Sequence, residues 1–107
     1  MSPMDDNAAI RLTFTPVFDR WLLRLRDQRA VARITTRLER LSSGHWGDVK
    51  PVGEGFSELR IAYGPGYRLY AMKKNDAWVI LLAGGDKSSQ VRDIVEAKRL
   101  AEEYRND

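Results

Sequence analysis

A chain of 107 residues is long enough for one domain with a single hydrophobic core. The absence of cysteine excludes disulfide bonds, a thiolate nucleophile and cysteine-ligated metal sites. The net charge of +3 and the pI near 9.4 suit either simple solubility or attraction to a polyanion.

No segment is apolar over the roughly 18 residues that a membrane-spanning helix needs. Residues 1–9 carry two aspartates and lack the apolar stretch of a signal peptide. The sequence therefore predicts one soluble, cytoplasmic domain over residues 1–107, without membrane association, in which residues 1–8 are disordered.

The N-terminal half is predicted to form one strand and two helices. Apolar residues alternate over 9–15, as in a half-buried strand, and Thr15-Pro16 is a helix start signal. Apolar residues then recur at three- and four-residue spacing over 16–27 and again over 29–42. Because the break between these helices is short, we expect an antiparallel helical hairpin.

The second predicted helix carries a stripe of arginines roughly opposite its apolar side. Its members recur at steps of four, four and three residues and are Arg29, Arg33, Arg37 and Arg40. Such a stripe is either ordinary solvated surface or a surface that contacts nucleic-acid phosphates. On the second interpretation, Arg33 and Arg37 are candidate substrate-binding residues.

The C-terminal half is predicted to contain short strands and a final helix. Turn sequences rich in Gly, Pro, Asn and Asp separate the strands, and the last strand is apolar almost throughout, as expected of a strand covered on both faces. The predicted elements are strands over 49–52, 56–63, 67–73 and 77–83 and a helix over 90–104. The predicted fold class is α+β, with an antiparallel sheet packed against the N-terminal helical hairpin and the C-terminal helix.

The hairpin of strands 56–63 and 67–73 gathers the candidate catalytic residues. Its odd-numbered apolar residues must share the core face, so its even-numbered residues share the other face, which we expect to point to solvent. The even-numbered set is Glu58, Arg60, Arg68 and Tyr70. A turn centred on Pro65 would place Arg60 opposite Tyr70 and Arg68 opposite Ala62.

These four side chains suit the cleavage of an RNA phosphodiester bond. Glu58 is the candidate base for the 2′-hydroxyl, and Arg60 and Arg68 are candidates to clamp the phosphate and stabilise the transition state. Tyr70 is a candidate to donate a proton or to stack on a base. The alternative interpretation is an ordinary sheet surface with a Glu–Arg pair.

Two lysines are further candidates for phosphate contacts. Lys50 is preferred to the lone loop histidine, His45. Lys87 lies in the segment 84–89 (GGDKSS), which is either an anion cradle ahead of a helix or a plain strand-to-helix turn, with Ser88 or Ser89 as the cap. With one histidine and no cysteine, no metal site or cofactor is expected.

The combination of motifs is similar to a known family. The motifs are GDVKPVG at 47–53, ELRI at 58–61, GPGYRLY at 64–70 and LLAGGDKSSQ at 81–90. Together they resemble the phage-derived addiction module killer branch of the RelE/HigB toxins, over roughly residues 10–100. The resemblance implies the compact RelE-like α+β toxin fold, with Arg60 and Arg68 at the reaction centre and Lys50 and Lys87 at auxiliary basic positions.

The resemblance also implies a function and partners. It implies the toxin of a type II toxin–antitoxin module that cleaves mRNA, often at the ribosome, without metal, and that a helix-turn-helix antitoxin neutralises. Several relatives carry a catalytic Tyr or His after the last strand, a position that is Asp86-Lys87-Ser88-Ser89 here, so either Tyr70 or Lys87 substitutes or the nuclease is weak. The alternatives are a ParE-like toxin that poisons DNA gyrase on the same fold, and a binding module without toxicity.

Overall fold

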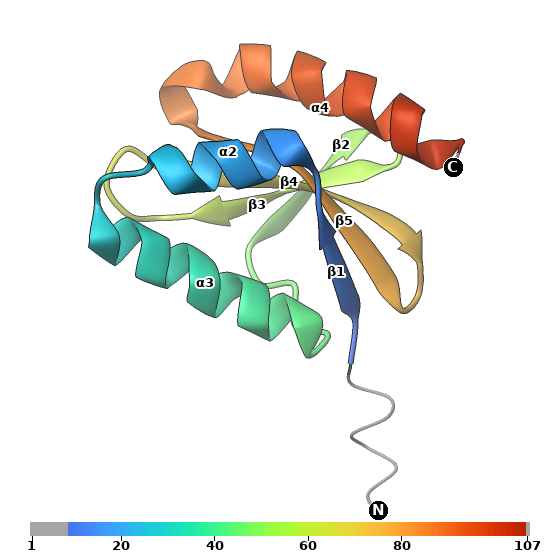
Figure 1. Ribbon diagram of the computed structural model, residues 1–107, viewed down its shortest axis with the longest axis horizontal. Helices are drawn as coiled ribbons and strands as arrows, with labels where there is room; N and C mark the ends of the chain where they lie inside the picture. The colour runs from blue at the N-terminus through green and yellow to red at the C-terminus, as the bar shows by residue number, and fades with distance from the viewer. Residues whose placement is uncertain (1–8, 107) are drawn as a thin grey trace, which may run out of the picture.

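A five-stranded mixed sheet forms the centre of the protein in a computed structural model that describes residues 9–106 (Figure 1). The strands are β1 (Arg11–Phe14), β2 (Val49–Gly53), β3 (Phe56–Ile61), β4 (Tyr67–Asn75) and β5 (Trp78–Asp86). Their order across the sheet is β1-β5-β4-β3-β2. The disorder expected for residues 1–8 lies outside the described residues.

The sheet is α+β in class, as predicted, but it is not wholly antiparallel. β2 to β5 form an antiparallel meander, whereas β1 pairs with β5 in parallel. The prediction of an antiparallel sheet is wrong in this respect, because an alternating pattern identifies a strand without showing which neighbour it joins or in which direction.

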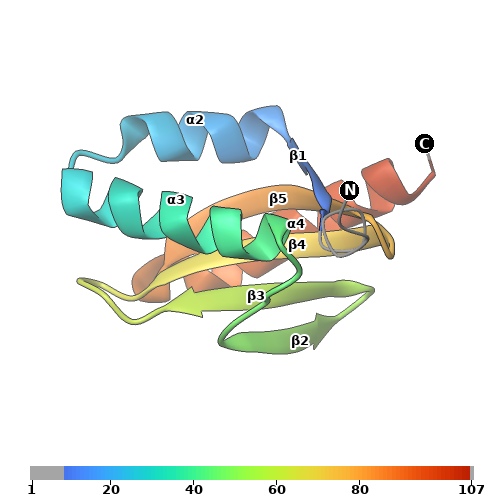
Figure 2. The same ribbon diagram turned by 90° about the horizontal axis from the view of Figure 1, so that it is seen from below.

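Helices cover both faces of the sheet. They are α2 (Pro16–Arg24), α3 (Gln28–Ser42) and α4 (Gln90–Arg105), with a short 3-10 turn, η1 (Lys87–Ser89), ahead of the last. Figure 2 shows α2 and α3 on the same side of the sheet, running in opposite directions. α2 makes its closest backbone contacts with β5, and both helices contribute side chains to the same apolar cluster against the sheet.

Two apolar layers result from this arrangement. α2 and α3 pack on the odd-numbered residues of β3 and β4, including Leu59 and Leu69. α4 packs on the other face, where Tyr70 and Met72 belong to the second layer. β5 contributes buried residues to both layers, which confirms the prediction of a strand covered on both faces.

The helix start at Thr15-Pro16 is confirmed, but the cap of the last helix differs from the prediction. The Thr15 hydroxyl accepts a hydrogen bond from the Phe18 N–H (3.1 Å) and donates one to the Leu82 carbonyl (2.6 Å). At the other end of the chain, Ser89 makes no capping hydrogen bond to α4. Instead the Asp86 carboxylate caps η1, because the chain tightens into a 3-10 turn before the α-helix begins.

The pairing of β3 with β4 confirms the predicted faces and corrects the predicted register. The observed pairs are Glu58 opposite Tyr70 and Arg60 opposite Arg68. These pairs centre the turn on Gly64, not on Pro65, because β3 ends at Ile61 and the five residues 62–66 form the connection. Gly64 (φ 55°) and Gly66 (φ 81°) adopt conformations that favour glycine, so this longer turn is available to the sequence.

Two consecutive glycines of β5 lie under the helices. The sequence placed Gly84 and Gly85 in a loop, whereas they pair with Leu69 and Arg68 of β4. A Cβ atom on Gly84 would lie far inside van der Waals contact with the Trp21 ring of α2. The glycine therefore allows the indole to pack directly on the strand backbone.

We predict that Gly84→Ala lowers the free energy of unfolding by about 1–3 kcal/mol, because the methyl group displaces Trp21 from the strand. Urea denaturation measures this change. Trp21→Ala removes the clash, so in the Trp21→Ala background Gly84→Ala should lower the free energy of unfolding much less. Equal costs in the two backgrounds would show that the Trp21 contact is not the reason for glycine at this position.

Candidate active site

Glu58 is a buried carboxylate under the first turn of α4. Its relative exposure is 2%, and its Oε1 accepts a hydrogen bond of 2.9 Å from the amide nitrogen of Gln90, the first residue of the helix. The opposite residue on β4, Tyr70, is fully buried. The prediction that the four-residue patch faces solvent is therefore wrong for Glu58 and Tyr70, because α4 also packs on the even-numbered face of the hairpin.

Arg68 supplies the positive charge nearest to Glu58. Its Nε lies 3.6 Å from Glu58 Oε2, and its side chain is 14% exposed. A carboxylate removed from water is strongly destabilising unless a cation and hydrogen bonds compensate it, and Arg68 and Gln90 fill these roles. The same contact holds the Arg68 side chain in place while leaving part of it accessible to a ligand.

Tyr70 has a polar atom without a partner in this buried environment. Its hydroxyl makes no hydrogen bond within residues 9–106, and its ring contacts Phe56 edge-on at 6.4 Å. Burial raises the pKa of Tyr70, and the negative charges of Glu58 and Asp93 raise it further, so the phenol stays protonated at neutral pH. In this arrangement the ring has no free face on which an RNA base could stack.

Arg60 lies opposite Arg68 and is the more accessible of the two guanidinium groups. Its Nη2 forms an exposed ion pair of 2.9 Å with Asp48, and its side chain is 37% exposed. Residues directly opposite on adjacent strands have Cβ atoms about 5 Å apart. The sheet therefore places two arginines side by side, each held by its own carboxylate, and we call them the arginine pair.

Arg37 has a structural role. Its guanidinium donates hydrogen bonds to the carbonyls of Trp46 (3.2 and 2.9 Å), Asp48 (2.6 Å) and Arg60 (2.6 Å). Burial lowers its pKa, and the charge of Asp48 partly offsets this. Gly47 adopts φ 70° and lies against this guanidinium, where a Cβ atom would be 2.8 Å from Arg37 Nε. The expectation that Arg37 is free to bind substrate is therefore not met.

The other arginines of the α3 stripe remain accessible. Arg33 stacks on the ring of Tyr63, with its Cζ 4.5 Å from the ring centre, and the Tyr63 hydroxyl donates to Asp27 (3.0 Å). A groove of about 700 Å³ separates α3 from the end of β3. We call it the arginine groove, and its charged lining residues are Arg29, Arg33, Arg37, Arg40, Asp48 and Arg60. Arg60 lines this groove and also belongs to the arginine pair.

The two candidate lysines are exposed and lie on either side of the arginine pair. Lys50 on β2 is paired with Glu58 and so shares its face of the sheet. Lys87 follows Gly85, the β5 partner of Arg68, by two residues. Both positions allow a phosphate contact near the arginine pair.

His45 is also accessible, next to the arginine groove. It is exposed and lines a smaller hollow with Arg37 and Arg40. No group of three or more His, Asp or Glu side chains within the described part of the chain is arranged to hold a metal ion.

Sequence reasoning missed two residues that hold the arginine pair. Gln90 binds Glu58, and Asp48 binds Arg60. Both residues occur within the motifs that carry the family resemblance, but nothing in their local sequence shows that they contact a carboxylate or an arginine of β3. Only the fold of α4 over the sheet and of the loop before β2 brings them there.

Comparison with known proteins identifies a relative but no function. No family model matches the chain. A protein of Haemophilus influenzae, whose name reads "Uncharacterized protein", is 50% identical over 94 residues, which cover 88% of this chain and 95% of that protein. Identity at this level over nearly the full length of both proteins shows that this chain belongs to the same family as the Haemophilus influenzae protein.

Proposed function

We propose that the protein is the toxin of a type II toxin–antitoxin module and that it cleaves mRNA at the arginine pair. The observation that carries this proposal is the placement of Arg60 and Arg68 directly opposite each other. Like charges in this position repel, and a phosphate between them converts the repulsion into two attractive, charge-assisted contacts. Asp48 and Glu58 keep both guanidinium groups in place before the substrate arrives.

The wider surface supports RNA as the substrate. The arginine groove runs along α3 and includes Arg60, and its exposed arginines offer positive charge to the phosphates of a strand. In this proposal the compact α+β domain is the RelE-like toxin fold that the motifs imply. The protein would act in the cytoplasm without a cofactor, with mRNA on the ribosome as its target and a helix-turn-helix protein as its antitoxin.

The burial of Glu58 and Tyr70 changes the roles proposed for them. We assign Glu58 as a positioning residue for Arg68, because it has no access to a 2′-hydroxyl. Lys87, which is exposed beside the arginine pair, replaces Tyr70 as the candidate acid. The 2′-oxygen attacks phosphorus and loses its proton to water, the bond to the 5′-oxygen breaks, and Lys87 protonates that oxygen. The arginine pair stabilises the charge of the phosphorane.

The same burial favours a second candidate function. If the substrate requires a side-chain base beside the arginine pair, neither Glu58 nor Tyr70 supplies one. The surface would then bind a target without cutting RNA, as in a ParE-like toxin that poisons DNA gyrase. Transcript integrity and plasmid supercoiling after induction distinguish these two functions.

Loss of either arginine of the pair should abolish toxicity. We expect induced wild-type protein to stop growth and produce new RNA ends, and Arg60→Ala to reduce RNA cleavage roughly 100-fold because one transition-state contact is lost. Arg68→Lys keeps a counter-charge for Glu58 while removing the planar fork, so it should stay folded with a similar loss of cleavage.

Arg26→Ala is the matched control, since Arg26 is exposed in the loop between α2 and α3. It should keep full toxicity. Intact transcripts with halted plasmid supercoiling would replace the nuclease proposal by the gyrase alternative. Normal growth of cells producing folded wild-type protein would indicate a binding module.

Glu58→Gln should slow cleavage without changing its pH dependence. Without its counter-charge the Arg68 side chain is free to move. We expect cleavage to be about tenfold slower, which corresponds to one ion pair of about 1.4 kcal/mol. Gln90→Met removes only the amide that holds Glu58 and should slow cleavage by a smaller factor. Rates of cleavage of an RNA oligonucleotide across pH give the test. Disappearance of an acidic limb in Glu58→Gln would instead show that Glu58 is the base.

Two arginines of the α3 stripe should behave differently when replaced. Arg33→Ala should weaken RNA binding and reduce the slope of log K against log salt by about one, because it removes one phosphate contact. Arg37→Ala should mainly lower the free energy of unfolding, by about 1–3 kcal/mol, since it removes hydrogen bonds to three carbonyls. Filter binding at several salt concentrations tests the Arg33 variant, and urea denaturation tests the Arg37 variant. A binding constant independent of salt would exclude the stripe as an RNA surface.

A further inference from the structure

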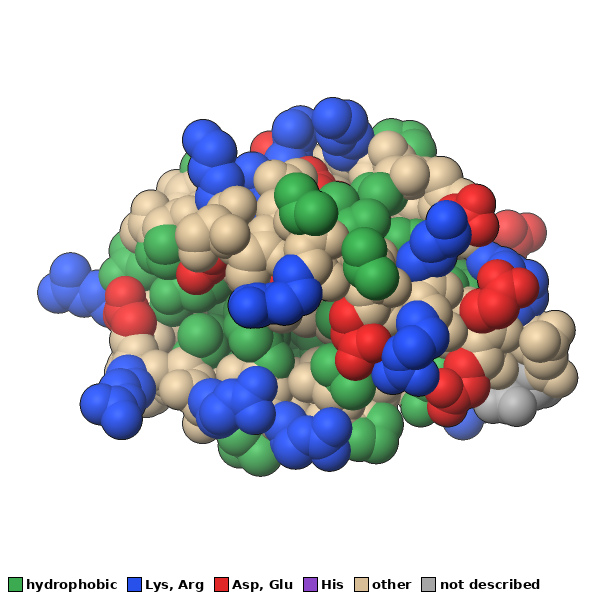
Figure 3. Space-filling view, turned by 90° about the horizontal axis from the view of Figure 1, so that it is seen from above, with side chains coloured by type: hydrophobic (Ala, Val, Ile, Leu, Met, Phe, Trp, Pro, Cys, Tyr) green, Lys and Arg blue, Asp and Glu red, His purple; other side chains and the backbone are tan. Residues whose placement is uncertain are grey.

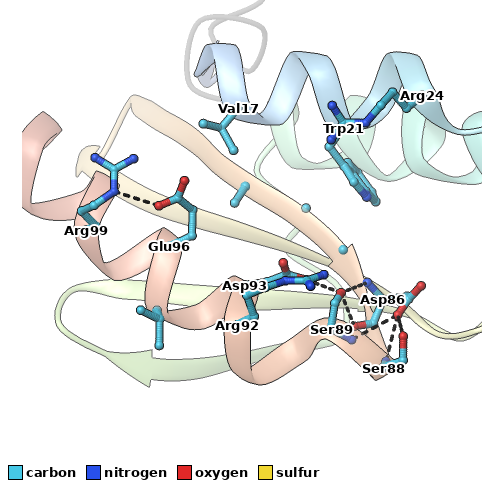
Figure 4. A pocket seen from close by; sticks show the side chains of 14 residues that line it. Val17, Trp21, Arg24, Asp86, Ser88, Ser89, Arg92, Asp93, Glu96 and Arg99 are labelled. Atoms are coloured by element: carbon cyan, nitrogen blue, oxygen red, sulfur yellow. Dashed lines mark hydrogen bonds and ion pairs between the residues drawn. The ribbon is translucent and has the colours of Figure 1, made fainter.

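Two hollows of similar size on the protein differ in their charge. A cleft between α2 and α4 has a volume of about 650 Å³, and the arginine groove has a volume of about 700 Å³. Of the described residues that line the cleft, three are arginines and three are carboxylates, and Glu96 pairs there with Arg99 at 2.8 Å (Figure 4). Figure 3 shows acidic and basic side chains interspersed on the face that is uppermost in Figure 1, where α4 lies. The cleft therefore selects no ligand by charge.

The arginine groove, in contrast, is selective for an anion. Among the described residues that line it, five are arginines and one, Asp48, is a carboxylate. Asp48 is already engaged in the ion pair of 2.9 Å with Arg60. Grooves lined by one sign of charge concentrate ligands of the opposite sign. Charge alone does not distinguish one anion from another, so the shape of the groove surface has to identify the ligand.

Arg33 presents a flat cation to this groove. Its Cζ lies 4.5 Å from the centre of the Tyr63 ring. Arg33 is exposed and lines the groove, whereas Tyr63 is half-buried and is not among the lining residues, so the guanidinium lies between the ring and the groove. One face of the guanidinium is covered by the aromatic ring, and the opposite face is accessible to a ligand.

The ring beneath Arg33 is anchored to the helix that carries Arg33. The Tyr63 hydroxyl donates a hydrogen bond of 3.0 Å to Asp27. The Asp27 carboxylate is in turn the N-cap of α3, where it accepts hydrogen bonds from two backbone N–H groups. Because the ring is held in this way, the guanidinium has a fixed surface to stack on before a ligand arrives. Such preorganisation lowers the entropic cost of binding a flat group.

We propose that Arg33 and Tyr63 form a stacking platform for one nucleobase of a single RNA strand bound in the arginine groove. Phosphates require only charge, whereas unpaired bases stack on aromatic rings and on guanidinium planes, and the platform combines both groups. Arg60 lines the same groove, so a strand with a phosphate at Arg60 can place one of its bases on Arg33. The proposal rests on the proposed function for RNA as the ligand, but it does not depend on cleavage.

A short uridine oligonucleotide with one central 2-aminopurine tests the platform with the full-length protein. Methylation of its 2′-hydroxyls prevents cleavage, so that binding is measured alone. Stacking quenches the fluorescence of 2-aminopurine, and we expect quenching when the protein binds. A matched strand carries an abasic site in place of the 2-aminopurine and keeps the same phosphate charges. It should bind about tenfold more weakly, as expected for the loss of one stacked base.

Arg33→Lys separates stacking from charge, because it keeps the positive charge and removes the flat guanidinium. It should weaken the quenching and reduce the difference in affinity between the two strands to about twofold, without changing the slope of log K against log salt. Replacing Tyr63 by Leu in the same variant should abolish the quenching. Arg33 is exposed, so Arg33→Lys should remain folded. Arg26→Lys is the matched control outside the groove and should bind both strands as the wild type does.

Two results in these assays would overturn the proposal. Equal affinity of the wild type for the 2-aminopurine strand and the abasic strand, or no binding of either, would show that the groove does not bind a base. An Arg33→Lys variant with the full preference for the 2-aminopurine strand would show that stacking occurs elsewhere. Failure of the proposed function has a different signature: intact transcripts after induction, together with quenching that depends on Arg33, would reject RNA cleavage and support the platform.

Discussion

The burial of the Glu58 carboxylate under α4 is the constraint on which the candidate active site depends. Glu58 is fixed by the Gln90 amide from above and by the Arg68 guanidinium from the side. An ionised carboxylate in this position is tolerated only with such partners, so the position of α4 and the position of Arg68 are linked. Arg68 is thus held from inside the domain by a residue that a ligand does not touch, whereas Arg60 is held at the surface by Asp48.

The sequence predicted the composition of the candidate site better than its geometry. Alternation along β3 and β4 correctly assigned Glu58, Arg60, Arg68 and Tyr70 to one face, because a strand with a two-residue period leaves no other choice once its apolar face is known. The pairing partners were wrong because they depend on the length and centre of the turn. Two glycines with positive φ allow a turn centred on Gly64, and no pattern in the strands reveals this.

Burial was the second property that local patterns could not provide. The polar residues Glu58 and Arg68 gave the even-numbered face the character of a surface, yet the same face carries Phe56, Tyr70 and Met72. The face is divided along its length: the C-terminal part of α4 covers the apolar end, and its first turn reaches the polar end. The prediction of one exposed face assumed that all residues on this face are equally exposed. A helix that crosses the strands buries some of these residues more than others.

The α3 stripe shows how tertiary structure separates residues that are equivalent in sequence. Arg33 and Arg37 occupy the same face of the helix one turn apart, but the loop before β2 folds back against only one of them. Three carbonyl groups on that loop and on β3 accept hydrogen bonds from the Arg37 guanidinium, whereas Arg33 stacks on the ring of Tyr63. A periodic row of like charges therefore contains members with different roles, and the number of carbonyl oxygens within reach decides which arginine stabilises the fold and which remains available to a phosphate.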